Sequence, residues 1–154
     1  HSTVAAPSTA AQAAAAAMDE GGRFVLTTPN VLSLTSRVRT LLAGFPELFG
    51  PLPINGYDPQ HVGGHIHPVS VYHIAYMAEK AGFRVIGCST DRVKSGSAAL
   101  LILWPLVKLG SAIVAMHARR NVPAIYKENR EHLARMNSFA ILTGRTVIIE
   151  MERR

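Results

Sequence analysis

Four histidines in the middle of the chain are the side chains best suited to chemistry, because an imidazole titrates near neutral pH and can also bind a metal ion. They are His61, His65, His67 and His73. The spacing of His65 and His67 would put both rings on one face of a strand. However, Pro68 follows at once, and no carboxylate stands at a spacing that would complete a three-ligand site. His65 stands in a glycine-rich loop expected near the mouth of the sheet, so we interpret it as a candidate catalytic base or substrate-positioning residue, with a small histidine-metal protein as an alternative.

A second group of polar side chains stands where a predicted strand ends. Residues 21–30 read GGRFVLTTPN: a glycine pair turns the chain, an apolar and β-branched run follows, and Pro29 and Asn30 stop it. Ligands of open α/β sheets bind beyond the carboxyl ends of the strands, so Thr28 and Asn30 fall where a pocket is expected. The alternative is an ordinary turn from a strand to a helix.

The elements predicted around these residues alternate between helix and strand. Helices are indicated by apolar residues three and four apart and by glycines at positions 44 and 82, and strands by short β-branched runs. The predicted helices cover residues 10–18, 31–42, 70–81 and a charged segment from Pro123, and the predicted strands cover residues 23–28, 83–89 and 146–151.

The segment of residues 45–64 is too rich in proline and glycine for a regular element. A loop of this length inside a compact domain is commonly functional. Its aromatic and imidazole side chains, which can line a pocket, are Phe45, Phe49, Tyr57 and His61.

Three of these segments together resemble the second half of a class I S-adenosylmethionine-dependent methyltransferase, of the type that acts on small molecules or lipids (types 11 and 12). In that family, GGR, a hydrophobic run and TPN form the fifth strand and its loop, as in residues 21–30 here. H-x-x-P, here His65 to Pro68, precedes a helix that ends in AGF, here residues 81–83. Residues 142–149, LTGRTVII, resemble the last, antiparallel strand of the family.

The resemblance implies an α/β fold with part of a Rossmann-like sheet, in which the three strands lie in the order first, third, second and the last is antiparallel to the others. It implies S-adenosylmethionine as cofactor, a small-molecule or lipid acceptor, and His65 in a loop over the acceptor pocket. Thr28, Asn30, Tyr57 and His67 are then the substrate-pocket residues.

The chain departs from the family where the cofactor is held. The family's glycine-rich turn after the first strand and the acidic residue that ends the second are both absent, so no cofactor-binding residue is identified. We therefore expect this chain to be the carboxyl-terminal portion of the parent enzyme and to be inactive alone. One edge of its sheet would be exposed and would need the amino-terminal half or another partner to cover it.

Residues 98–116 are almost wholly apolar over nearly the length of a membrane span, with basic residues on both sides. Pro105 would kink such a span, and a central Lys108 would cost about 2.5–3.5 kcal/mol, so full spanning is disfavoured. The two other interpretations are a helix pair packed on the sheet and a hairpin resting on a membrane surface. The membrane contacts would then include Leu101, Trp104, Leu106 and Ile113.

Charge and composition limit the remaining classes. The 154 residues carry a formal net charge of +6, but the basic residues are scattered and do not alternate with aromatics, which disfavours nucleic acid and favours anionic headgroups. The single Cys88 cannot form an internal disulfide, so we expect a cytoplasmic protein, peripheral on the inner face of a membrane if it binds one. Residues 1–18 form an alanine-rich tail or helix, and residues 19–154 the domain. A non-catalytic membrane-surface or partner-binding module is the main alternative function.

Overall fold

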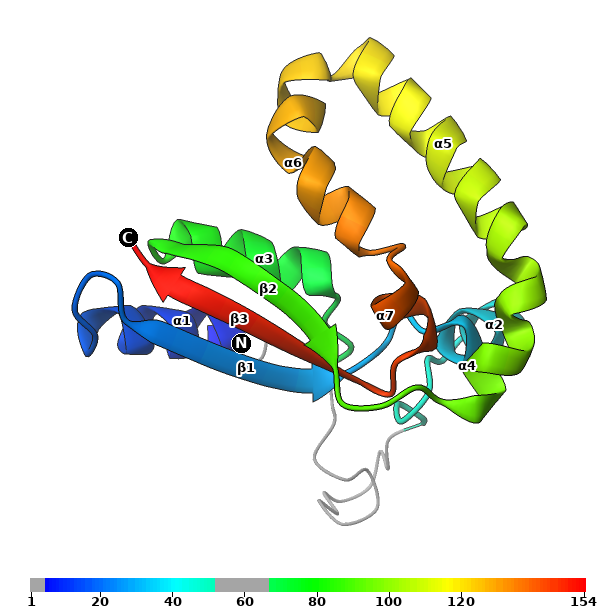
Figure 1. The fold of residues 1–154 in the computed structure, drawn as a ribbon, viewed down its shortest axis with the longest axis horizontal. Coiled ribbons are helices and arrows are strands. Elements are labelled where there is room, and N and C mark those ends of the chain that lie inside the picture. Colours follow the sequence, from blue (N-terminus) through cyan, green and yellow to red (C-terminus); the bar gives the residue numbers. More distant parts are fainter. Residues whose placement is uncertain (1–4, 52–66) are drawn as a thin grey trace.

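The computed structural model describes residues 5–51 and 67–154, which form a mixed α/β fold with one three-stranded sheet (Figure 1). Its elements are α1 (Ala5–Ala16), β1 (Arg23–Pro29), α2 (Leu34–Ala43), α3 (Val71–Lys80), β2 (Phe83–Thr90), α4 (Ser95–Ala99), the 3-10 helix η1 (Leu100–Leu103), α5 (Trp104–Asn121), α6 (Pro123–Arg135), α7 (Phe139–Thr143) and β3 (Thr146–Arg153).

The strands lie in the order β1-β3-β2, and β3 is antiparallel to both neighbours. The predicted order and direction are confirmed. Arg23 pairs with Glu152 at one end of the β1 ladder, and Pro29 pairs with Thr146 at the other. A bulge at Ile86 shifts the register between β2 and β3. Because β1 and β2 both oppose β3, they run parallel to each other, and their carboxyl ends meet at one edge of the sheet.

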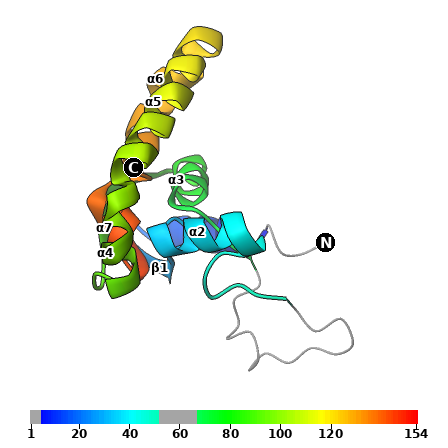
Figure 2. The same cartoon turned by 90° about the vertical axis from the view of Figure 1, so that its right-hand side faces the viewer.

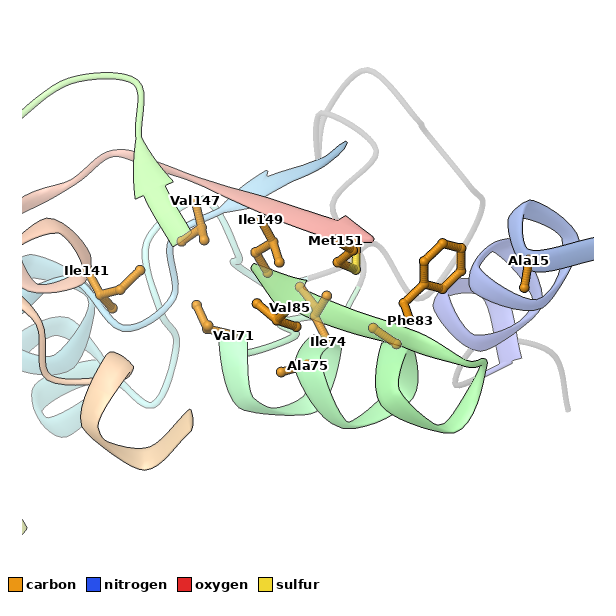
Figure 3. Close-up of a cluster of buried hydrophobic side chains, with 11 residues drawn as sticks. Ala15, Val71, Ile74, Ala75, Phe83, Val85, Ile141, Val147, Ile149 and Met151 are labelled. Carbon is orange, nitrogen blue, oxygen red and sulfur yellow. The ribbon is translucent and has the colours of Figure 1, made fainter. Parts of the chain in front are cut away.

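The hydrophobic core lies between one face of this sheet and α3, and Ala15 of α1 extends it at one end (Figure 3). Phe83, Ile149 and Met151 are almost completely buried there. The side chains of a strand alternate between faces, so these residues come from one side of the pleat. Phe24 packs against Phe83 with ring centroids 5.7 Å apart. Burial of these large side chains is what fixes the register of the three strands.

The opposite face of the sheet is polar and open. Val25 is 56% exposed there, and Arg84 donates to the Glu152 carboxylate across the strands at 2.7 Å. β1 and β2 each pair with β3 alone among the described strands, so each is an edge of the sheet. One exposed edge was predicted, and the described part of the sheet has two, β1 and β2.

The caps explain where the shorter helices begin and end. The Ser33 hydroxyl accepts from the Ser36 N–H and opens α2, which ends before Gly44 at φ 76°. The Ser70 hydroxyl accepts from the His73 N–H and caps α3 as predicted. Asn30 stands just before the predicted helix but does not cap α2, because its side-chain oxygen accepts from the Leu32 N–H and its amide donates to the Ile141 carbonyl.

Two helices differ from their predicted form. α1 begins at Ala5, earlier than the predicted residue 10. Leu41 and Leu42 of α2 were expected on a buried apolar face, but they are 84% and 80% exposed. The buried residues of α2 are Leu34 and Ser36, near its amino-terminal end, so only that end packs into the domain.

α5 and α6 form a long helical hairpin that projects away from α2, α3 and the sheet (Figure 2). No residue of either helix is buried. The interpretation of residues 98–116 as a helix pair packed on the sheet is therefore wrong. The helical segment Ser95–Asn121 is long and apolar enough to cross a membrane, with a mean hydropathy of 2.0 in its most apolar part.

Candidate functional site

The candidate site lies where the carboxyl ends of β1 and β2 meet the turn before β3. Backbone hydrogen bonds hold the three segments together: the Asn30 N–H donates to the Arg145 carbonyl at 3.1 Å, and the Arg145 N–H donates to the Arg92 carbonyl at 3.1 Å. The Lys94 N–H donates to the Thr143 carbonyl at 2.8 Å. The loops that the topology brings to this edge therefore form one rigid floor.

An open cavity of about 480 Å³ lies at this floor. Its walls come from the turn after β1, the loop after α2, the loop after β2 and the turn before β3. The lining residues are Asn30, Ser33, Glu47, Leu48, Arg92, Val93, Lys94, Ser95 and Arg145. Leu48 has φ 67°, the left-handed region that a branched side chain seldom adopts, so the loop wall is held in a strained conformation.

The cavity carries more positive than negative charge. Lys94 forms an ion pair with Glu47, and the side chains of both are about a quarter exposed. Arg92 lies 3.9 Å from the Asp91 carboxylate, a loose pair at an exposed position. Arg145 is exposed and has no ion-pair partner among the described residues. Two guanidinium groups are thus available to a ligand that carries a carboxylate or phosphate group.

Asn30 is the structural centre of the floor. Its side chain is buried, and its amide donates to the carbonyls of Ile141 at 2.6 Å and Gly144 at 2.8 Å. Its side-chain oxygen accepts from the Leu32 N–H at 3.0 Å. All of these partners are backbone groups, so Asn30 positions the cavity wall and has little capacity left to bind a ligand.

Buried hydroxyl groups support the cavity from behind. The Ser36 hydroxyl donates to the Asn30 carbonyl and accepts from the Glu47 N–H, both at 3.2 Å. The hydroxyls of Thr35 and Ser97 lie 2.8 Å apart and join α2 to α4. Because each of these groups has a partner, the network fixes the two loops without leaving an unpaired polar atom.

The predicted substrate-pocket residues do not all lie at the cavity. Asn30 lines the cavity, whereas Thr28 does not; Thr28 is half-buried and shares its strand face with Phe24 and Leu26. His67 is exposed and lies just before the cap of α3. Tyr57, His61 and His65 lie outside the described residues.

The other predicted contacts fall on or near the hairpin. Trp104, Leu106 and Ile113 are 47%, 66% and 53% exposed, whereas Leu101 is half-buried in η1. Within residues 5–51 and 67–154, no three His, Cys, Asp or Glu side chains are grouped closely enough to hold a metal ion.

Sequence reasoning missed the cationic lining of the cavity. Arg92 and Lys94 follow the predicted strand 83–89 directly, and Arg145 precedes the predicted strand 146–151. Their positions next to strand ends were a usable signal, because the predicted strand order already brings these ends to one edge of the sheet. The contribution of Glu47 had no such signal, since it depends on the path of the loop after α2.

Two ionisable groups outside the cavity are perturbed by burial. Burial raises the pKa of the Cys88 thiol above its ordinary value, and Arg135 lowers it only in part. Cys88 is therefore a protonated thiol at neutral pH that packs against the core, and not an activated nucleophile. Burial also lowers the pKa of Arg37, which donates to the carbonyls of Leu32 at 2.8 Å and Met136 at 2.9 Å.

Comparisons of this chain with models of known protein families, with curated proteins and with solved structures find no match.

Proposed function

We propose that this chain is the carboxyl-terminal, acceptor-side portion of an S-adenosylmethionine-dependent methyltransferase with a Rossmann-like sheet. The observation that carries the proposal is the strand order β1-β3-β2 with an antiparallel central strand. The same order follows from the resemblance of residues 21–30, 65–68 and 142–149 to that family. A strand that enters between two parallel strands is a specific arrangement, and simple hairpin connections do not produce it.

The cavity at the carboxyl ends of β1 and β2 supports an acceptor site there, since ligands of open α/β sheets bind at this edge. The guanidinium groups of Arg92 and Arg145 favour a small-molecule or lipid acceptor that carries a carboxylate or phosphate group. In this proposal His65 takes the acceptor proton or positions the acceptor, and Tyr57 and His67 contribute to the same pocket.

The described residues do not fit the cofactor itself. The turn after β1 has no glycine, and the Asn30 amide in that turn is already bound to backbone carbonyls. A turn that cradles a cofactor needs free backbone donors and room for close approach, which glycine supplies. We therefore assign no cofactor contact to this chain and propose that S-adenosylmethionine is held by an amino-terminal half.

The free edge of β1 supports this division. A strand of an amino-terminal half can pair there and extend the sheet, which would also remove an edge prone to aggregation. We propose a cytoplasmic location for the protein, since Cys88, the single cysteine, is a free thiol.

A transfer assay tests the proposal. The longest natural polypeptide that contains these 154 residues is incubated with S-adenosylmethionine labelled in its methyl group, and with a lipid extract or a water-soluble metabolite extract as acceptor. We expect label in one of the two acceptor pools and an equal amount of S-adenosylhomocysteine. If S-adenosylhomocysteine does not accumulate with either pool, the proposal is wrong.

Variants at the cavity show whether transfer uses it. Arg92→Ala together with Arg145→Ala should raise the acceptor KM by roughly tenfold or more, because each removes a charge-assisted hydrogen bond. The matched control is Arg39→Ala with Arg84→Ala, two exposed arginines that do not line the cavity. An equal effect of both pairs would exclude the cavity as the acceptor site.

A further inference from the structure

The hairpin of α5 and α6 stands largely free of the domain. The two helices contact each other, α5 also touches η1, and α6 touches α3 beside the base. Arg37 anchors that base through the Met136 carbonyl, and the Asn137 amide donates to the Ser111 hydroxyl at 2.8 Å. The hairpin is therefore held at its base, with an open cavity of about 590 Å³ between α5 and α6 and with the other side of α5 exposed.

The open side of α5 carries a continuous apolar stripe. Its members are spaced three, four and three residues apart, which places them on one face of the helix. The stripe consists of Leu106, Leu109, Ile113 and Met116 of α5, which are 66%, 60%, 53% and 49% exposed, and it is preceded by Ile102 of η1, which is 83% exposed. The half-buried residues of α5 that face α6 lie on the opposite side of the helix: Val107, Ser111, Ala115 and Ala118.

The segment that carries this stripe is positively charged. Between Asp91 and Glu128 the chain has no acidic residue. The basic residues of the same interval are Arg92, Lys94, Lys108, Arg119, Arg120 and Lys127. Arg119 and Arg120 follow Met116 by three and four residues and so adjoin the stripe at the tip of the hairpin, whereas Lys108 lies on the side of α5 that faces α6. An exposed apolar stripe in a basic segment is the pattern of a helix that lies in a membrane interface.

We propose that the apolar stripe docks the protein on a bilayer that contains anionic phospholipids, with α5 lying along the surface. Trp104 does not belong to the stripe. It lies seven residues before Ser111, on the side of α5 that faces α6, and the Lys108 ammonium stands 5.5 Å from its ring centroid. The inference goes beyond methyl transfer and does not depend on it.

The partner of α5 argues for a surface position over a span. α6 carries Lys127, Arg130 and Arg135 together with Glu128 and Glu131, which are too many charges for a hydrocarbon core. If α5 spanned the bilayer, it would have to leave α6 and break the bond between Asn137 and Ser111. Lying flat, α5 keeps both contacts and exposes only its apolar stripe to the acyl chains.

Charge also favours a bilayer over a second copy of this chain. Two copies joined through the stripe would bring their lysines and arginines together, and like charges at close range are destabilising. Anionic headgroups neutralise the same residues, and each lysine or arginine near such a surface strengthens the attraction.

Vesicle binding by the full chain tests the proposal. The probe is vesicles of phosphatidylglycerol and phosphatidylcholine in equal parts, with pure phosphatidylcholine vesicles as comparison. We expect co-sedimentation with the mixed vesicles, weaker binding to the neutral ones, and a loss of binding as salt rises.

Paired variants locate the contact. Leu106→Glu with Ile113→Glu should weaken vesicle binding by at least roughly tenfold, since it places two charges in the apolar stripe. The control, Leu41→Glu with Leu42→Glu, adds the same charge on α2 at leucines that are also exposed, and should change binding much less. Circular dichroism of all variants confirms that they fold.

Four results would overturn the proposal. They are equal binding by the stripe variant and its control, equal binding to neutral and anionic vesicles, no loss of binding as salt rises, and a dimer in lipid-free sedimentation that the stripe variant abolishes. The last result would assign the stripe to a second copy of the chain. Because no step requires methyl transfer, failure here is distinct from failure of the proposed function.

Discussion

Replacement of Asn30 by alanine is expected to lower the free energy of unfolding by about 3 kcal/mol, since three hydrogen bonds of a buried side chain are lost at about 1 kcal/mol each. The amide of Asn30 joins the turn after β1 to the carbonyls of Ile141 and Gly144, whose positions are distant in the sequence. A chain of this size should then melt roughly 10 °C lower, which thermal unfolding followed by circular dichroism measures.

Two further variants test whether this loss of stability comes from the buried hydrogen bonds of Asn30 and not from the removal of an asparagine side chain in general. Asn121→Ala removes an exposed asparagine at the hairpin tip and should change stability by less than about 0.5 kcal/mol. Asn30→Asp keeps the shape but cannot donate to the two carbonyls, so it should destabilise at least as much as alanine. If Asn30→Asp is as stable as the unsubstituted chain, the donor role of Asn30 is wrong.

Substitution of Gly144 by alanine is expected to lower the free energy of unfolding by about 3 kcal/mol, which is in the upper part of the range for overpacked sites. A Cβ atom there would lie 2.6 Å from the Ala140 carbonyl oxygen and would also clash with the Thr90 side chain. The backbone of Gly144 has ordinary angles, φ −73° and ψ 151°, so the cost comes from space and not from conformation. Urea unfolding of the variant measures it.

The matched control for this prediction has the opposite sign. Gly110 lies within α5, and no atom stands within 4 Å of the position that its Cβ would take. Gly110→Ala should therefore stabilise the chain by about 0.5–1 kcal/mol through lower backbone entropy in the unfolded state. Similar losses at both glycines would contradict the packing described at the turn before β3.

The sheet could be predicted from the sequence because its signals are local and strong. Glycine pairs and caps mark the ends of its strands, and the apolar residues of residues 146–151 alternate as a strand requires. The strand order came from the resemblance, and not from these patterns. Ser70 and Gly82 likewise fixed the limits of α3, because a cap is a property of one or two residues.

The parts that sequence reasoning missed depend on distant contacts. α7 has only five residues, which is too short for a recognisable repeat of apolar positions. Burial of its side chains against the floor of the cavity stabilises it. The role of Asn30 required the carbonyls of residues more than a hundred positions away. The exposure of α5 could not be predicted from its apolar composition. A helix buried in a protein core and a helix in contact with lipid have similar compositions.

Calorimetric titration with S-adenosylhomocysteine tests the proposed methyltransferase function, because the reaction product binds a methyltransferase without needing an acceptor. We expect saturable micromolar binding by the longest natural polypeptide that contains these 154 residues, and no binding by the folded 154-residue chain alone. Failure of that polypeptide to bind, with its fold verified by circular dichroism, would contradict the methyltransferase assignment. Binding by the 154-residue chain alone would contradict the division of cofactor and acceptor between two halves.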